Sequence, residues 1–353
     1  MEIIKGTLLL LIVLGLFSLF SYKAPKGMKA MGALANAAVA AFLVEAFQRF
    51  VGGDLLKIEF LGEVGDAAAS MGGVAAAALV SLAMGVSPVY ALMMGVSVAG
   101  LGLLPGFIAG YLIAFLVKWI EKRIPGGLDL IVTIIVAAPL VRLVAVWMQP
   151  VVDATLLNIG GIITETANSS PILMGIILGG VITTVATAPL SSMALTAMLG
   201  LTGVPMAIGA LSVFGSSFMN FILFKRMKFG DRKTTIAVAI EPLTQAHIIS
   251  ANPIPIYITN FIGGASAGVI VALSGLINNA TGTATPIAGL AVMYGFNDPL
   301  KVTLVALGCA AAGLVSGYIG SLLFKNVKIK TADQISREES KEKLEEAEEK
   351  LAI

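Results

Sequence analysis

Three long stretches of the sequence, residues 67–117, 167–224 and 242–297, contain no Asp, Glu, Lys or Arg. A helix needs about 20 apolar residues to cross the hydrocarbon core of a bilayer, so each stretch can hold two or three crossings. Over the whole chain of 353 residues only 12% are charged, about half the share of a soluble domain. The sequence therefore predicts an all-α, polytopic membrane protein. It excludes a soluble enzyme, a secreted disulfide scaffold and a nucleic-acid-binding protein.

The apolar segments predict about ten transmembrane helices. They lie near residues 5–22, 30–50, 69–86, 88–104, 105–121, 128–148, 171–190, 194–224, 259–277 and 300–324. Two further apolar regions, 236–258 and 283–297, are interrupted by Pro, Asn and Gly. Broken backbone at membrane depth survives only inside protein or beside a watery cavity, so these regions predict two re-entrant hairpins.

The predicted organisation has four parts. They are an N-terminal membrane scaffold half (1–148), an interfacial amphipathic linker (149–170), a substrate-binding transport half (171–325) and a charged tail (326–353). Lys and Arg are retained on the cytoplasmic side of a membrane, and basic residues cluster in three loops, which places the tail in the cytoplasm. These clusters lie at residues 118–123, 225–233 and 325–330. Lysines 23, 26 and 29 form a fourth cluster that conflicts with an even number of spans, so the side of the N-terminus stays open.

Polar residues concentrate between Glu241 and Asn260, where three prolines accompany an acid, a Gln and the only His of the chain. We interpret this stretch as a hairpin that lines a polar cavity, with Glu241, His247 and Asn252 as candidate substrate ligands. The alternatives are a helix-starting acid for Glu241 and a histidine bonded to backbone for His247. No second His or Cys accompanies His247, so we expect no metal site.

Two more polar clusters interrupt apolar sequence, at residues 183–192 and 278–286. They add candidate substrate-binding hydroxyls, on Thr187, Ser191, Ser192 and Thr285. The alternatives are hydroxyls that bond back to their own helix or pack against a neighbour at 183–192, and an external loop at 278–286. Neutral hydroxyl and amide groups with one carboxylate suit a sugar or polyol better than an anion, which would require Lys or Arg. The sequence leaves the role of Arg142, inside a span, and of the acidic tail open.

The order of elements resembles the membrane-embedded IIC permease of the bacterial phosphotransferase system, fructose-type branch. The resemblance begins with PGFIAGY at 105–111 and the basic loop at 118–123, and continues through the span that ends at 149–150 and PILMG from 171. The region around Glu241 looks like the acid-containing loop of that family. The resemblance implies a homodimer in the bacterial plasma membrane whose transport half moves the substrate by an elevator mechanism, with Glu241 as sugar ligand and catalytic base.

The sequence also departs from the fructose-type pattern. Residues 186–192 lack the acid and the lysine of those permeases, and Pro286 is not followed by His and Gly-Gly. It is therefore similar to the divergent, stand-alone group that includes perfringolysin-regulator-like proteins. No IIA or IIB domain is attached, so phosphoenolpyruvate-dependent sugar phosphorylation would need separate IIB and IIA partner proteins. We expect no cofactor.

Two other functions remain open. One is a gradient-coupled transporter on the same fold that has lost phosphorylation, which the missing acid and lysine favour. The other is a membrane sensor or regulator that signals through the acidic tail. The sequence does not identify the substrate.

Overall fold

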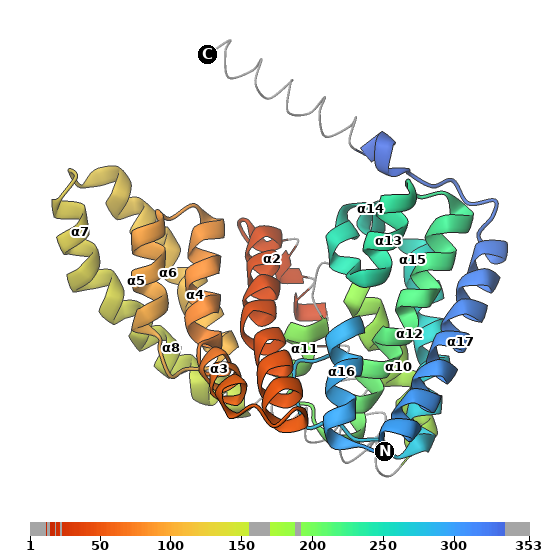
Figure 1. Ribbon diagram of the computed structural model, residues 1–353. Helices are drawn as coiled ribbons and strands as arrows, with labels where there is room; N and C mark the ends of the chain where they lie inside the picture. The colour runs from red at the N-terminus through yellow and green to blue at the C-terminus, as the bar shows by residue number, and fades with distance from the viewer. Residues whose placement is uncertain are drawn as a thin grey trace.

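The chain folds into helices throughout, which confirms the predicted all-α class. The computed structural model describes residues 23–154, 170–187 and 192–335, with a few positions between 12 and 21. Within these residues every named element is a helix, and the only bridge pairs Gly203 with Asn278. Figure 1 shows two helical bodies side by side, with the long helix that begins at α2 between them.

The first body contains the helices up to residue 152. In chain order they are α2 (Gly27–Ala38), η1 (Val39–Leu43), η2 (Ala46–Leu55), α3 (Glu59–Ser70), α4 (Gly72–Met84), α5 (Pro88–Ser97), α6 (Leu103–Arg123), α7 (Leu128–Val132), η3 (Thr133–Ala137) and α8 (Ala138–Val152). The first three run as one helix whose π-helical stretches η1 and η2 follow α2. Through η2 and α2 this long helix packs against α16 and α11 of the second body.

The second body contains the remaining helices. They are α10 (Pro171–Thr187), α11 (Ser192–Met198), α12 (Gly203–Met227), α13 (Arg232–Ile240), η5 (Pro242–Gln245), α14 (Ala246–Ala251), α15 (Pro253–Ser274), α16 (Pro286–Phe296) and α17 (Pro299–Leu323). Helix α12 lies at the centre of this body and contacts α10, α15, α16 and α17. Most of the predicted linker, residues 155–169, and the tail after residue 335 lie outside the described residues.

Six helices in the described part of the chain are long and apolar enough to cross a membrane, so the predicted count of about ten is not confirmed. They are Gly27–Leu55, Leu103–Arg123, Leu128–Val152, Gly203–Met227, Pro253–Ser274 and Pro299–Leu323. The first predicted segment, 5–22, lies mostly outside the described residues. A seventh span results if α3 and α4, bent by 53° at their break, count as one. One of the ten predicted segments, 88–104, contains α5, whose 10 residues extend only about half of the ~30 Å hydrocarbon core. Helix α16, at 11 residues, lies in the region 283–297 that was predicted as irregular.

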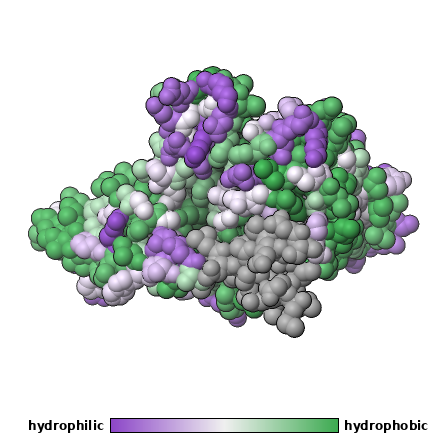
Figure 2. All heavy atoms as spheres, turned by 90° about the horizontal axis from the view of Figure 1, so that it is seen from below, coloured by the Kyte–Doolittle hydropathy of each residue, from purple (hydrophilic) through white to green (hydrophobic). Residues whose placement is uncertain are grey.

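The two bodies expose the apolar surface that a bilayer requires. Large exposed hydrophobic side chains occur along α5, α6, α7–α8 and α17, and Figure 2 shows hydrophobic residues over most of the perimeter, with hydrophilic residues in separate patches. In the most apolar stretch of the helix Leu128–Val152, only 22% is buried inside the protein. Together with the six spans, this surface establishes a multi-pass membrane protein.

Helix α8 supplies polar side chains to a break in the first body. Arg142 donates from Nη1 to the carbonyls of Ala99 (2.6 Å) and Ser97 (3.3 Å), just after α5 ends. The Gln149 side-chain oxygen accepts from the Gly102 N–H at 3.0 Å, just before α6 begins. Backbone groups freed by a broken helix need such partners at membrane depth. Arg142 therefore has a structural role at the turn between α5 and α6.

Small residues bring α10 and α15 into close contact. Gly175 and Gly179 face Gly268 and Gly264, and a Cβ atom added at Gly264 would collide with the Thr183 hydroxyl. Thr183 itself donates to the Asn260 carbonyl at 2.8 Å across the same interface. Association of membrane helices depends on this kind of close backbone packing because lipid is as apolar as the side chains.

The four basic clusters lie at one end of the molecule. Figure 1 shows the start of α2, the end of α6, the end of α12 and the segment after α17 at its upper end. Two contacts agree with the picture. Lys26 Nζ donates to the Met84 carbonyl at 2.6 Å, and Asn252 is bonded to Lys330. Lysines 23, 26 and 29 are therefore on the same side as the other three clusters.

Candidate functional site

A broken helix pair, which we call hairpin 1, extends from residue 232 to residue 251. The Asp231 carboxylate caps α13 by accepting from the Thr234 N–H at 2.8 Å, as N-cap acids do. Pro242 cannot donate a backbone hydrogen bond and disfavours helical geometry at Glu241, so α13 ends there. After η5, the short helix α14 leads to Asn252 and Pro253, where α15 begins.

Glu241 lies at the tip of hairpin 1. Its backbone carbonyl accepts from the Thr244 N–H at 3.1 Å and from the Thr244 hydroxyl at 2.7 Å, which closes the turn. Its carboxylate oxygen Oε2 accepts from the Thr285 hydroxyl at 3.2 Å. The residue is half-buried rather than open to bulk solvent.

Residues 275–296 form a second broken element, hairpin 2, from the irregular segment 275–285 and helix α16. The Asn278 side chain organises the irregular part, donating to the Thr283 hydroxyl and accepting from the Ala280 N–H, both at 2.9 Å. Pro286 occupies the first turn of α16, where its missing N–H costs nothing. Thr285, immediately before it, forms the tip that meets Glu241. The two hairpins therefore contact each other tip to tip.

The end of α10 and the start of α11 adjoin the second tip. Helix α10 ends at Thr187 and α11 begins at Ser192, whose hydroxyl donates to the Ala284 carbonyl at 2.6 Å. The Thr187 hydroxyl is buried and donates back to the Thr184 carbonyl of its own helix at 2.8 Å. The η5 turn of hairpin 1 packs against α10 as well. The two hairpins and the described ends of α10 and α11 thus gather in one place, where protein surrounds the irregular backbone of the hairpins.

The structure brings together three of the seven predicted ligands, Glu241, Thr285 and Ser192. Thr187 lies at the neighbouring helix end, but its hydroxyl is used within α10. Asn252 lies elsewhere: its side chain exchanges two 2.8 Å hydrogen bonds with the Lys330 backbone and ties α14 to the segment after α17. His247 belongs to α14, with its side chain outside the described residues, and Ser191 also lies outside them.

Sequence reasoning did not single out one polar pair in the core of the second body. Asn220 of α12 and Asn260 of α15 are fully buried and exchange side-chain hydrogen bonds of 2.9 and 3.3 Å. An amide side chain in an apolar stretch of a membrane helix needs a hydrogen-bond partner, but the sequence does not identify which residue provides it. The pair fixes α12 against α15, whose N-terminus follows hairpin 1.

The geometry at the tips suits recognition of hydroxyl groups. A carboxylate accepts hydrogen bonds from hydroxyl donors, and the Glu241 carboxylate already accepts one from Thr285. The side-chain hydrogen bonds that join Glu241, Thr244, Thr285 and Ser192 at the tips come from hydroxyl groups. The chemistry of these groups therefore suits a neutral polyhydroxylated molecule.

Two opposed broken hairpins within a bundle of membrane helices define a class of membrane transport protein, in which the substrate site lies where discontinuous helices meet. The family model for the EIIC component of the phosphotransferase system matches residues 28–336. The chain belongs to this family of membrane-embedded sugar permease components. Comparisons with curated sequences and with solved structures return no significant match.

Proposed function

We propose that the protein carries a sugar or related polyhydroxylated solute across the membrane and binds it where the tips of hairpins 1 and 2 meet. The observation that carries this proposal is the hydrogen bond between the Thr285 hydroxyl and the Glu241 carboxylate. It joins residues 44 positions apart in sequence. A substrate hydroxyl can take the place of Thr285 on the carboxylate, so substrate binding and separation of the tips would be linked.

The clustering of basic residues supports an orientation. All four clusters lie at the end that carries the tip-bearing hairpin 1, and Lys and Arg are retained on the cytoplasmic side. We place that end, with the tail, in the cytoplasm of a bacterial plasma membrane. Hairpin 1 would then enter from the cytoplasm and hairpin 2 from outside.

Phosphorylation of the substrate would depend on other proteins. The only cysteine, Cys309, is fully buried in α17 between helices, where no phosphate donor can reach its thiol. The phosphoryl group would come from a separate IIB protein that is charged by IIA. Glu241 would accept the proton of the substrate hydroxyl as the phosphoryl group is transferred.

The finer assignment is to the fructose-type branch and, within it, to the divergent stand-alone group. The departures at residues 186–192 and after Pro286 support that group. In this assignment the first body is the scaffold of a homodimer and the second body moves relative to it. The exposed apolar face of α7–α8 offers a surface for a second copy.

Transport without phosphorylation is the second candidate function, because residues 186–192 carry neither acid nor lysine. Membrane vesicles that contain the protein distinguish the two functions. Uptake of a labelled sugar that requires phosphoenolpyruvate with the soluble carriers, and that yields sugar phosphate, supports phosphorylation. Accumulation of unmodified sugar with an ion gradient alone supports the second function. A sensor function makes a different prediction. Deletion of residues 331–353 would then abolish signalling, and signalling would persist in a variant that no longer takes up sugar.

Glu241→Gln tests the site in the same vesicles. We expect uptake to fall about tenfold or more, because hydrogen bonds to a charged acceptor are worth about 1.5–3 kcal/mol each. Glu59→Gln is the control, since Glu59 is an exposed carboxylate in α3 of the first body. Unchanged uptake in Glu241→Gln would show that the tips are not the binding site.

A further inference from the structure

A groove runs between α12 and α17 on the outer side of the second body. It consists of three cavities of about 450, 480 and 370 Å³. The first two share Ile222 and Leu314, and the last two share Phe214, Phe218 and Leu314. The cavities are therefore parts of one continuous groove, which opens toward the bilayer.

The chemistry of the groove changes along its length. The first cavity lies at the basic end and is lined by Lys225 and Arg226 together with Tyr318 and three aliphatic residues. Arg226 stacks on the Tyr318 ring at 4.4 Å and donates from Nε to the Ser321 hydroxyl at 2.7 Å, which holds the guanidinium beside the groove. No acidic residue is among those that line this cavity.

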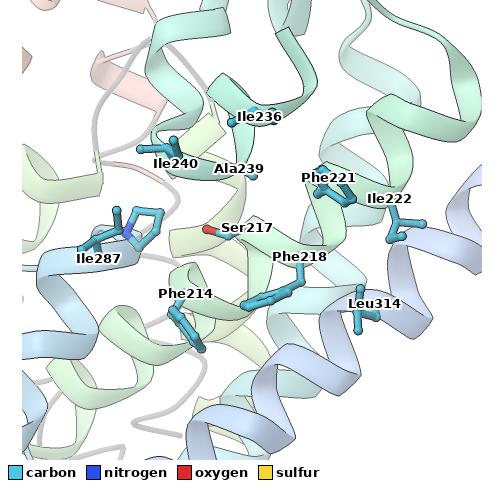
Figure 3. A pocket seen from close by; sticks show the side chains of 11 residues that line it. Phe214, Ser217, Phe218, Phe221, Ile222, Ile236, Ala239, Ile240, Ile287 and Leu314 are labelled. Carbon is cyan, nitrogen blue, oxygen red and sulfur yellow. The ribbon is translucent and has the colours of Figure 1, made fainter. Parts of the chain in front are cut away.

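The second cavity is apolar and reaches both hairpin tips, since Ile240 and Pro286 line it. Figure 3 shows Phe214, Phe218 and Phe221 of α12 on one side and the end of α13 on the other. Ile240 precedes Glu241 in the chain, and Pro286 follows Thr285. The Ser217 hydroxyl, at the wall between them, is buried and has no hydrogen-bond partner in the described part of the chain.

We propose that this groove binds one anionic phospholipid, with its phosphate on Lys225 and Arg226 and its acyl chains in the two apolar cavities. Charge complementarity selects the headgroup, because a basic pocket at the end of two membrane helices attracts anionic lipid. The apolar walls accommodate the acyl chains, since the two apolar cavities are lined mainly by aromatic and aliphatic side chains. A lipid in this position contacts the residues next to Glu241 and Thr285.

The lipid site follows from the groove alone and does not depend on the proposed transport function. Purified full-length protein is tested by native mass spectrometry with phosphatidylglycerol and, as the neutral comparison, phosphatidylcholine. We expect preferential retention of phosphatidylglycerol. The double variant Lys225→Gln/Arg226→Gln should weaken it about 30-fold, because two basic contacts are lost. Lys118→Gln/Lys122→Gln is the control. It removes the same amount of charge at the same end of the molecule, but from α6 rather than from the groove.

A second variant tests the cavity proposed for the acyl chains. Ala311→Trp places a large side chain in the third cavity and should lower retention of phosphatidylglycerol without changing the headgroup contacts. Circular dichroism of each variant confirms that it is folded. Equal retention of the two lipids, or retention unaffected by Lys225→Gln/Arg226→Gln, would overturn the proposal. Dissociation of an oligomer by Ala311→Trp, with an unchanged number of bound lipids, would also overturn it. The groove would then hold a second copy of the protein rather than a lipid.

Discussion

Glu241 and Thr285 are joined by a single side-chain hydrogen bond of 3.2 Å, although each belongs to a different broken helix. At the residue scale, the site therefore depends on side-chain contacts between the two hairpins. The backbone of either hairpin alone does not set these contacts. The buried amides of Asn220 and Asn260 have a similar role in the core, where they join α12 to α15. Each such pair is sensitive to loss of one partner.

The Asn220–Asn260 pair provides a test of this sensitivity. Asn260→Leu should destabilise the protein by about 1–3 kcal/mol, because it leaves the buried Asn220 amide unsatisfied. The double variant Asn220→Leu/Asn260→Leu should be less destabilised than the sum of the single variants, since no orphan amide remains. Unfolding in detergent measures all three. Strict additivity would mean that the two amides do not interact.

Acid should weaken the start of hairpin 1 through Asp231. Hydrogen bonds from the backbone and the side chain of Thr234 hold the pKa of the Asp231 carboxyl below its ordinary value of 3.8. A carboxyl whose pKa is lowered by folding stabilises the folded state above its ordinary pKa, and this stabilisation is lost as the pH falls through the folded-state value. The protection factors of residues 232–240, which are corrected for the intrinsic pH dependence of amide exchange, should therefore be constant near neutrality and fall below about pH 4. Asp231→Asn, which keeps a capping oxygen, should remove the pH dependence while keeping most of the protection.

At the scale of elements, the helix crossing between α10 and α15 depends on glycine. Gly264 has no room for a Cβ atom, because the Thr183 hydroxyl and the Gly179 carbonyl occupy the position. Helices that approach this closely cannot separate without losing the Thr183–Asn260 hydrogen bond. The crossing therefore has little tolerance for larger residues.

Gly264→Ala should cost about 1–3 kcal/mol, the usual cost of overpacking a core. Gly32→Ala is the matched control, because a Cβ atom at Gly32 in α2 would meet nothing within 4 Å. That control should be neutral or stabilising, since Ala is favoured over Gly in helices. The thermal midpoints of the two variants in detergent give the comparison, and equal midpoints would contradict the close crossing.

At the scale of the whole molecule, the two ends carry different charge. The basic clusters lie at the end that we place in the cytoplasm, whereas α3, at the lower end in Figure 1, carries Glu59, Glu63 and Asp66. In a Cys309→Ser background, we expect K328C to react with an impermeant thiol reagent only from the cytoplasmic side. We expect E63C to react only from outside. Reaction of both positions from the same side would invalidate the orientation.

Much of the fold class could be predicted from the sequence, because a chain with three long charge-free stretches can satisfy its backbone in a bilayer only as helices. The proline-rich segment after Glu241 also identified a broken element, since proline restricts its own position and the one before it. The predicted number of spans is not confirmed, since the described part of the chain holds six clear ones. Hydropathy measures how apolar α5 is, but its length depends on where a neighbouring helix, α8 with Arg142, satisfies the broken backbone.

The sequence by itself determined that the chain is helical, lies in a membrane and carries a lone carboxylate beside prolines. Only the tertiary structure decided which polar groups meet: it placed Thr285 and Ser192 near the Glu241 tip and tied Asn252 to Lys330 instead. It also assembled the groove between α12 and α17 from residues about 90 positions apart. The physical reason is that composition and periodicity are local properties, whereas hydrogen-bond partners and cavities depend on how helices distant in sequence pack.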